Sequence, residues 1–418
     1  RSLLVTGVQT CALPIWSSMK IKKLASLVLA ASLTLASGCG AGLPFDGGGA
    51  DTLPKECASL NDFSAVLTRV LDDREDNLAL SPLSAYIALA MAAEGSAGET
   101  KAQFEKVLGA STDDIASAVG RINKRLMDLK GSTKLAVAQS VWTDDSVEFS
   151  EDYISHLADL YKADIYSGKL SSTDVRNAIN RWAADNTNGL IDPFLSSNLD
   201  DNTVMALLNT IYFKGTWQRR FDPETTRGSF ENAGGGTGTV DYMHLSASLK
   251  YIDTDEVTGV VLPYDDGKTQ MIVVMPKDSA ELPSAAVCRM GSGGLAKAAA
   301  DAGEKRIGLS LPSFTVECSL EMNKALNTMG LTDAFTDGAD FSGMGDGGFA
   351  ISQVLQKVKL IVDTEGTEAA AVTAIIMKET AMMPEDQLEL TFDRPFYYAV
   401  MDTETSIPLF TGVYNTAQ

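Results

Sequence analysis

The most informative segment of the chain is Gly366-Thr367-Glu368-Ala369-Ala370-Ala371-Val372-Thr373, which follows the strand-like run 357–363. A strand places alternate residues on opposite faces, so one face would carry Thr367, Ala369, Ala371 and Thr373. That face is uniformly small and uncharged, and such a segment can enter a sheet between two strands without overpacking the core beneath. Taken alone, the alanine-rich residues favour a surface helix or a solvated linker, so the rest of the chain decides.

The chain begins with segments that do not belong to a folded domain. Residues 1–18 have the character of translated vector or adapter sequence and are excluded from fold reasoning. Residues 19–38 are typical of a signal peptide, with three lysines before an apolar run that is too short to span a bilayer comfortably. The signal ends before Cys39 in a pattern that resembles a bacterial lipobox, although Ala36 stands where Leu is usual.

We therefore expect Cys39 to be lipidated, with an ordinary secretory signal as the alternative. Residues 39–55 are rich in glycine and would form a flexible tether. The protein would be exported and held at the cell surface or released outside the cell. The remaining residues, 56–418, contain no linker, repeat or low-complexity block long enough to divide them, so we predict a single domain.

The charge and the cysteines exclude several classes of function. The net charge is −21, and removal of residues 1–38, with four positive charges and no acid, brings it to about −25. Such a protein repels nucleic-acid phosphates and anionic lipid headgroups, so we expect no nucleic-acid partner and membrane contact only through the lipid. Cys57, Cys288 and Cys318 show no CxxC spacing, which leaves either one disulfide or three inert thiols and predicts no metal site or cofactor.

The hydrophobic pattern predicts a mixed α/β protein with one large sheet. Pro82 fits the first turn of a helix, and Thr100 fits the N-cap of the next one. The run 204–213 is apolar without alternation, which predicts a strand buried on both faces. Helices are predicted over 61–71, 85–94, 113–129 and 174–187, and further strands over 134–142, 257–262, 270–275, 306–311, 398–401 and 409–414.

A series of short motifs follows the order found in the serpin family, which the chain resembles from about residue 57 to its end. Any one of these motifs is weak, but their ordered occurrence across a whole domain is specific. They are Asn77 with Ser81–Ser84, Thr187–Gly189, Asn209–Gly215 with Trp217, Leu262–Tyr264, Leu311–Phe314, Met329–Phe335, Ala339–Ser342, Gly366–Thr373 and Asp393–Phe396.

This resemblance implies a serpin fold of three β-sheets and about nine helices with an exposed reactive-centre loop. The implied function is inhibition of a serine protease, or alternatively a cysteine protease, by a monomeric suicide substrate that is not an enzyme. Cleavage of the loop would let residues 367–380 insert as a strand of the central sheet, which traps the acylated protease and releases strain stored in the fold.

The resemblance also assigns positions to individual residues. Residues 366–373 would be the hinge segment of the loop, and Thr367 would enter the sheet first. Trp217 falls where the top of the loop would enter the sheet. Ordinary core packing is the alternative explanation for this residue. The residues expected at the opening of the sheet are Ser81, Ser84, Asn209, Gln356 and Trp217. The two serines among them also suit a helix cap with a buried hydroxyl.

Two residues depart from the family pattern. Gln356 stands where the family usually has histidine, and it can hydrogen-bond but cannot titrate. Thr364 stands where an acidic residue is usual, two positions before the hinge glycine, with Glu365 beside it. These departures bear on how stable the unopened sheet is.

The scissile bond is open to more than one assignment. Spacing from Gly366 places it between Thr380 and Ala381, whereas counting back from Pro395 places it near Met383. Thr380, or alternatively Met382 or Met383, before the cut favours an elastase-like or chymotrypsin-like protease, and only Lys378 would suit a trypsin-like pocket.

Three rival interpretations remain. A non-inhibitory surface-binding protein of the same fold would favour bulky or charged residues on the inserting face, and this face has none. A serine hydrolase would need His156 or His244 as its base, and no GxSxG motif surrounds any serine. The acidic residues Asp337, Asp340 and Asp346 lie among glycines without the spacing of a calcium loop, which favours turns.

Overall fold

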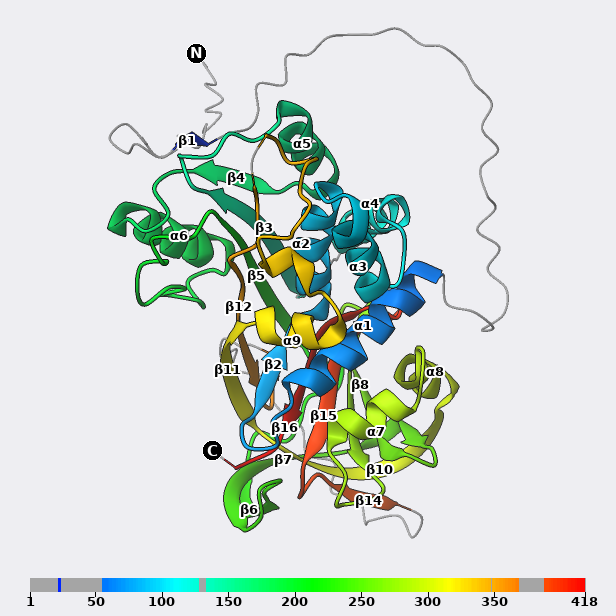
Figure 1. Cartoon of the computed structure of the whole chain (residues 1–418). Helices are drawn as coiled ribbons and strands as arrows, with labels where there is room; N and C mark the ends of the chain where they lie inside the picture. Colours follow the sequence, from blue (N-terminus) through cyan, green and yellow to red (C-terminus); the bar gives the residue numbers. More distant parts are fainter. Residues whose placement is uncertain (1–21, 24–54, 128–132, 347, 368–386, 418) are drawn as a thin grey trace, which may run out of the picture.

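The computed structural model describes residues 22–23, 55–127, 133–346, 348–367 and 387–417 (Figure 1). Cys39, hinge residues 368–373 and the scissile-bond candidates 378–383 lie outside these ranges. Nine α-helices are described: α1 Lys55–Leu71, α2 Pro82–Glu94, α3 Gly98–Leu108, α4 Thr112–Met127, α5 Glu151–His156, α6 Thr173–Asn186, α7 Pro283–Arg289, α8 Gly294–Asp301 and α9 Asn323–Met329. None of them combines the length and the apolarity needed to cross a membrane.

Helix α2 is the central helix of the core. Ser81 caps its first turn, because the hydroxyl accepts a hydrogen bond from the backbone N–H of Ser84 at 3.2 Å, and Pro82 occupies the first helical position as predicted. Every residue from Pro82 to Ala93 is buried, which fits the all-apolar sequence. The prediction for the next helix is wrong: α3 begins after Ala97, and Thr100 is buried inside its first turn, where the hydroxyl accepts from the N–H of Asp340.

The strands form two hydrogen-bonded sheets, and the mixed α/β class is confirmed. The central sheet runs β1 (Lys22–Lys23), β4 (Asp164–Ser167), β3 (Lys134–Thr143), β5 (Met205–Thr216), β13 (Gly366–Thr367), β12 (Gln353–Val362) and β11 (Phe314–Glu321). The second runs β14 (Leu388–Thr391), β10 (Gly303–Pro312), β7 (Thr237–Asp253), β8 (Val257–Pro263), β9 (Thr269–Pro276), β15 (Phe396–Asp402), β16 (Pro408–Tyr414) and β2 (Leu78–Leu80), with β6 (Thr226–Glu231) beside β7.

The long strand β7 explains why three expected sheets are connected as two. Its first part pairs with β6, a long middle part pairs with β10, and its last residues pair with β8. The expected second and third sheets therefore share one strand. At the other side of the molecule, β1 adds to the free edge of β4, with Lys22 opposite Ser167. These lysines belong to the segment for which we expect removal with the signal.

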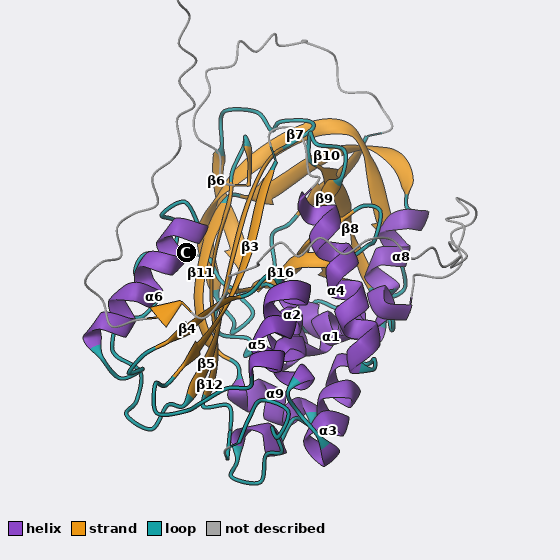
Figure 2. Ribbon diagram, turned by 90° about the horizontal axis from the view of Figure 1, so that it is seen from above, coloured by secondary structure: helices purple, strands orange, loops and turns teal. Residues whose placement is uncertain are grey.

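Helices cover both faces of the central sheet (Figure 2). Strand β5 is buried on both, as predicted, because its alternate residues enter two different cores. Met205 and Leu207 pack into the main core with α2, whereas Ala206 and Leu208 pack into the smaller core under α6. The central strand thus separates an α2 side from an α6 side.

Candidate functional site

The candidate site lies between β12 and β5, the two central strands of the sheet. They pair in parallel from Gln353 opposite Ala206 to Lys357 opposite Thr210. Both strands continue beyond this point, β12 to Val362 and β5 to Thr216, but their mutual ladder stops. We call the line between residues 353–362 and 205–216 the seam, and it is closed over only part of its length.

The first two residues of the hinge segment already occupy the far end of the seam. Thr367 lies opposite both Gly215 of β5 and Val362 of β12, so β13 runs antiparallel between the two strands. A Cβ atom built on Gly366 would lie 2.0 Å from the Gly215 carbonyl oxygen, so only glycine fits there. Asp363 shapes the preceding turn, because its side chain accepts hydrogen bonds from the N–H groups of Glu365 and Gly366.

Trp217 lies against this turn, where the sequence placed the top of the loop. Its indole donates to the carbonyl of Asp363 at 2.8 Å, and its backbone N–H donates to that of Glu365 at 3.0 Å. The ring is buried and stacks on Tyr264 with 4.7 Å between centroids. The Tyr264 hydroxyl in turn shares a 2.6 Å hydrogen bond with the hydroxyl of Thr367. The two aromatic residues therefore fix the hinge turn and the first inserted residue.

On the α2 side, amide side chains span the closed part of the seam. Gln356 holds the start of α2 at two points, since it accepts from the N–H of Ser81 at 2.9 Å and donates to the Ser81 carbonyl at 3.0 Å. Asn209, directly opposite Gln356, donates to the Ser84 carbonyl at 2.9 Å. Gln139 lies opposite Asn209 on β3 and accepts from its amide. The structure thus brings together four of the five predicted opening residues and adds Gln139, whereas the fifth, Trp217, lies at the hinge turn.

Several polar atoms in this cluster are buried without a hydrogen-bond partner. Among the described residues they are Ser84 Oγ, Gln139 Nε2 and Asn209 Oδ1, and Thr210 Oγ1 is a further such atom on the opposite, α6 side of β5. A buried polar atom without a partner costs about 1–3 kcal/mol of stability. Three of these atoms lie beside the last pairs of the ladder between β12 and β5 and have no partner within the described protein.

On the α6 side, Lys357 belongs to the last residue pair of the ladder, opposite Thr210. Its ammonium donates to the carbonyl of Pro193, in the segment after α6, at 3.0 Å and lies 3.1 Å from the Glu317 carboxylate of β11. The hydrogen bond from Lys357 lowers the pKa of Glu317 below its usual value. The side chain of Lys357 is only 15% exposed, so this contact is better shielded than an ordinary surface pair.

Glu365 supplies an acidic side chain next to Thr364, the position at which the family usually has an acidic residue. Its carboxylate pairs with Arg220 at 2.6 Å, from the segment after β5. Both side chains are about a third exposed, and an exposed pair of this kind contributes about 0–1 kcal/mol. Thr364 contributes only its carbonyl, which accepts from the N–H of Phe221. The acidic contact at the hinge turn therefore comes from the neighbouring residue.

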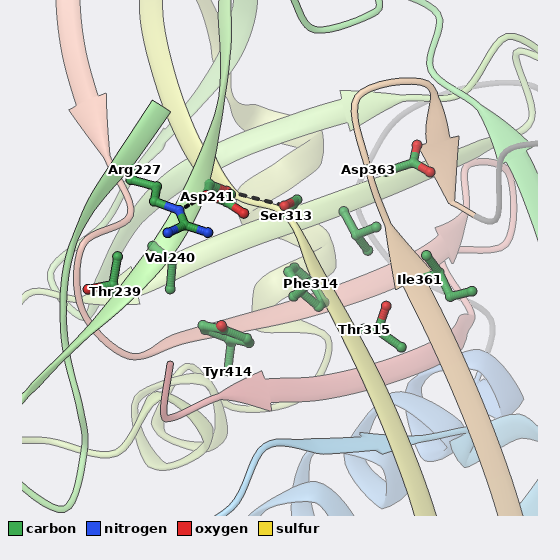
Figure 3. A pocket seen from close by; sticks show the side chains of 11 residues that line it. Arg227, Thr239, Val240, Asp241, Ser313, Phe314, Thr315, Ile361, Asp363 and Tyr414 are labelled. Atoms are coloured by element: carbon green, nitrogen blue, oxygen red, sulfur yellow. Dashed lines mark hydrogen bonds and ion pairs between the residues drawn. The ribbon is translucent and has the colours of Figure 1, made fainter. Parts of the chain in front are cut away.

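A cavity of about 530 Å³ borders the hinge turn beside the start of β11 and the end of β12 (Figure 3). Phe314 and Tyr414 form its apolar wall, and Arg227 and Asp241 pair across its polar side at 3.3 Å. Asp363, at the end of β12, also lines it. Ile361 and Asp363 at the end of β12 therefore border the cavity, and Val362 between them is buried in the main core.

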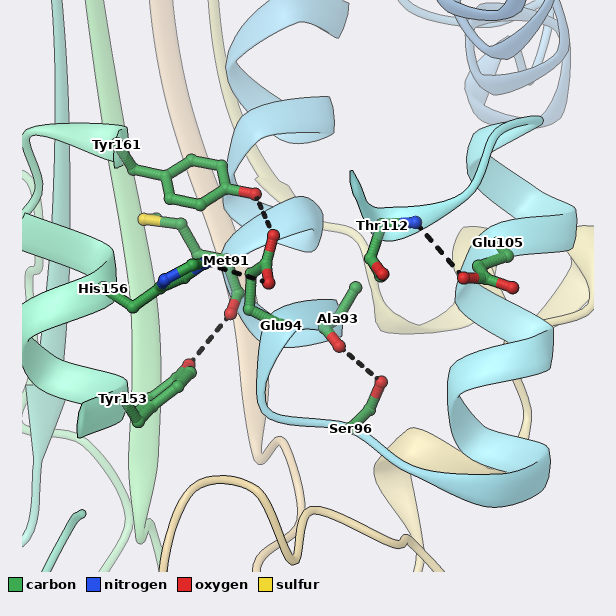
Figure 4. A network of polar contacts seen from close by, with 9 residues as sticks. All are labelled: Met91, Ala93, Glu94, Ser96, Glu105, Thr112, Tyr153, His156 and Tyr161. Carbon is green, nitrogen blue, oxygen red and sulfur yellow. Dashed lines mark hydrogen bonds and ion pairs between the residues drawn. The ribbon is translucent and has the colours of Figure 1, made fainter. Parts of the chain in front are cut away.

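The two histidines do not have the surroundings of a catalytic base. His156 pairs with Glu94 at 3.3 Å, and Glu94 also accepts from the hydroxyl of Tyr161 (Figure 4). The ring nitrogens of His244 face the hydroxyls of Thr226 and Ser310, so no carboxylate orients that ring. Within the described ranges, neither histidine lies between a nucleophile and an acid, as a triad requires.

The acidic residues around Asp340 and the cysteines are the remaining candidates for metal or thiol chemistry. No group of three or more metal-binding side chains is gathered in the described part of the chain. Asp340 accepts from the N–H of Ser342, which is turn chemistry as expected. Cys288 and Cys318 are free thiols, and burial raises the pKa of the Cys318 thiol. A bridge between these two cysteines is therefore absent.

Sequence reasoning missed Tyr264 and Gln139 as site residues. In the sequence, Tyr264 stands out only as part of the motif Leu262–Tyr264, and Gln139 only as part of the predicted strand 134–142. Their roles arise from register between distant segments, such as Tyr264 against Thr367, and hydrophobic periodicity does not encode that register.

Comparison with known proteins places the whole arrangement in one family. The model of the family "Serpin (serine protease inhibitor)" matches residues 58–416. An uncharacterised serpin-like protein of Thermococcus kodakarensis is 30% identical over 85% of this chain and 84% of its own length. Leukocyte elastase inhibitor A of Mus musculus is 32% identical over 80% and 92%, respectively.

A solved structure agrees with this assignment. The native state of tengpin, a thermophilic serpin, superposes with a TM-score of 0.81 at 31% identity and covers 88% of this chain and 95% of its own. The half-closed seam, the hinge segment at its end and the family match over residues 58–416 lead to one conclusion. The chain is a member of the serpin family of serine protease inhibitors.

Proposed function

We propose that this serpin inhibits its protease as a suicide substrate, by inserting its cleaved loop into the seam. Membership of the serpin family supports inhibition of serine proteases in general. We infer insertion of the cleaved loop from the register of the seam. Thr367 is already paired with Gly215 and Val362. Six residues further along in the same register, Thr373 would lie between Asn209 and Gln356. We call Gln356, Asn209 and Gln139, with Ser81 and Ser84 at the start of α2, the opening cluster.

The register also explains the small side chains of the hinge segment. Residues that face each other across neighbouring strands point to the same side of a sheet. Thr367 shares its side with Val362, and Gln356 and Asn209 lie on that same side, toward α2. Ala369, Ala371 and Thr373 would therefore enter the α2 core, where a larger or charged side chain would overpack it or remain unpaired.

Insertion would replace one short ladder by two longer ones. The present ladder between β12 and β5 covers Gln353–Lys357 only. A strand made of residues 367–380 would pair with β12 on one side and β5 on the other, and each net backbone hydrogen bond contributes about 0.5–1.5 kcal/mol. The hydroxyl of Thr373 would also reach the polar atoms that lack partners around Asn209. Both changes favour the inserted state.

The target that we propose is a serine protease with a pocket for small or apolar side chains. The proposed scissile bond is Thr380–Ala381, with Met382 and Met383 as alternatives, and none of these side chains is charged. One relative is named as an inhibitor of leukocyte elastase, which agrees with an elastase-like target. The proposed location is the cell surface, through a lipid on Cys39 and the tether of residues 39–55.

The test compares the wild type with two neighbouring glutamate variants of the hinge segment. Ala371→Glu places a charge toward the α2 core, whereas Ala370→Glu places it on the α6 side near Lys359. Each protein is mixed with elastase, chymotrypsin, subtilisin, trypsin and papain, and covalent complexes are separated on denaturing gels. We expect complexes for the wild type and Ala370→Glu, and cleavage without complex for Ala371→Glu. Equal complex formation by both variants, or cleavage of the wild type without complex by every protease, would contradict the proposal.

A further inference from the structure

Tyr264 is held in one position from two sides. It follows β8, in the second sheet, and its side chain is fully buried at 0% exposure. Its ring stacks on Trp217 at an interplanar angle of 13° and meets Phe213 edge-on with 5.0 Å between centroids. A Cβ atom on Gly215 would come within 2.7 Å of the ring, so the backbone of β5 also confines it. The hydroxyl therefore has a fixed direction.

The partner of this hydroxyl is the hinge segment itself. Thr367 is 1% exposed, and its side-chain oxygen lies 2.6 Å from the Tyr264 hydroxyl. Burial raises the pKa of Tyr264 well above its usual value, so the phenol stays protonated and the hydrogen bond persists across the physiological pH range. The second sheet thus contacts the first residue that enters the central sheet.

The backbone of β13 offers little else to keep it in the seam. The strand has two residues, Gly366 and Thr367, with pairing to β5 at both and to β12 at Thr367 alone. Such a short strand is marginal without side-chain contacts. The hydrogen bond between the fixed Tyr264 hydroxyl and Thr367 therefore contributes strongly to holding β13 in the seam.

We propose that Tyr264 is a positioning residue that holds Thr367 in the seam, so that loop insertion continues from a preformed strand. This inference rests on the proposed inhibitory function. It concerns the fraction of protease encounters that end in a trapped complex. After acylation, insertion competes with hydrolysis of the acyl-enzyme, which releases active protease. A strand that has already begun skips the nucleation step of insertion, and a larger fraction of encounters ends in trapping.

The test uses substitutions that remove the hydrogen bond with little change in volume. Tyr264→Phe and Thr367→Val each remove one hydroxyl, and Thr367→Ser keeps it. Tyr251→Phe is a matched control, because Tyr251 shares a 3.0 Å hydrogen bond with Thr258 within the second sheet, away from the hinge. Two quantities are measured: hydrogen exchange of the intact protein at residues 366–367, and the moles of inhibitor consumed per mole of protease trapped.

We expect Tyr264→Phe and Thr367→Val to accelerate exchange at Thr367 about five- to tenfold, the factor that one net hydrogen bond of ordinary strength contributes. Both should raise the inhibitor consumed per protease trapped by a similar factor, and the double variant should equal the single ones. Thr367→Ser and Tyr251→Phe should behave as the wild type. A merely structural role for Tyr264 would lower thermal stability without moving this ratio.

Two results would overturn the inference. One is unchanged exchange at Thr367 in Tyr264→Phe, and the other is faster exchange with an unchanged ratio of consumed to trapped inhibitor. Failure of the proposed function is recognised separately, because then the wild type traps no protease at all. In that case exchange at Thr367 still decides whether Tyr264 holds the hinge, since that measurement needs no protease.

Discussion

Gln356 of β12 lies directly opposite Asn209 of β5, one rung before the ladder between these strands ends. Both side chains point toward the start of α2, where Gln356 contacts Ser81 and Asn209 contacts Ser84. Separation of the two strands must therefore break contacts with the same helix turn. We therefore expect this pair to separate if the sheet opens to admit the loop.

The first prediction concerns the residue that replaces the usual histidine. In Gln356→His, a neutral ring can accept from the N–H of Ser81, whereas a protonated ring has only donors. Because protonation is disfavoured at this buried position, the pKa in the folded state lies below the value of about 6.5 in the unfolded chain, and stability is lost as pH falls below that value. Unfolding rates should rise below about pH 6.5 in the variant by up to tenfold per pH unit.

The control for this prediction is the wild type over the same pH range. The side chains of its opening cluster are amides and hydroxyls, so we expect no comparable step near pH 6.5. The interpretation would be contradicted if the wild type and the histidine variant showed the same pH profile.

The second prediction concerns Lys357, which connects β12 to the segment after α6. Lys357→Met keeps much of the aliphatic stem and removes the hydrogen bond to Pro193, so the barrier to opening should fall by about 1 kcal/mol. Lys359→Met is the matched control, since the contact of Lys359 is with the Glu317 carboxylate, at 3.6 Å, within the described ranges and not with the segment after α6. The measurement is the rate at which a synthetic peptide of residues 367–380 binds into the sheet. Equal rates for both variants would show that the Pro193 contact does not restrain the seam.

The third prediction concerns the residue that would reach the opening cluster. Thr373→Val preserves shape and removes the hydroxyl, so the polar atoms around Asn209 would remain without a partner after insertion. We expect the loop-cleaved variant to be less stable than the cleaved wild type by about 1–3 kcal/mol, with no change in the intact form. Guanidinium unfolding of the intact and cleaved forms measures both values. A loss confined to the intact form would place Thr373 elsewhere.

The fourth prediction concerns the alkaline limit of stability. Burial raises the pKa of Tyr397 to about 12, compared with about 10 in an unfolded chain. A raised pKa stabilises the fold below pH 10, and this contribution is lost between pH 10 and 12, at about 1.4 kcal/mol per pH unit for one group. Tyr397→Phe should flatten the fall in unfolding free energy over this range by up to one proton. An unchanged slope would contradict the assignment.

Several elements could be predicted from the sequence because local pattern determines them. An apolar run without alternation predicts the strand β5, and the structure gives the physical reason, because its alternate residues enter two cores. The start of α2 followed from Ser81 and Pro82. The cap of α3 was mistaken, because the hydroxyl of Thr100 serves a distant backbone group, at Asp340, instead of its own helix.

The seam itself could not be predicted from periodicity. Its register depends on pairs such as Gln356 with Asn209 and Thr367 with Gly215, which are more than 140 residues apart in the chain. Resemblance to a family supplied the opening residues, whereas Tyr264 and Lys357 emerged only from the contacts they make. Sequence patterns thus indicated the segment for which we propose insertion, and the structure added the contacts that surround its first residues.

The most direct test of the account is thermal unfolding of the protein before and after cleavage of its loop. The loop is cut with a protease that nicks it between residues 374 and 386 without being trapped, and the two fragments are kept together. We predict that the cleaved form unfolds at a higher temperature than the intact form, because residues 367 onward have completed the seam between β12 and β5. A cleaved form that unfolds at the same or a lower temperature would contradict insertion and, with it, the proposed mechanism.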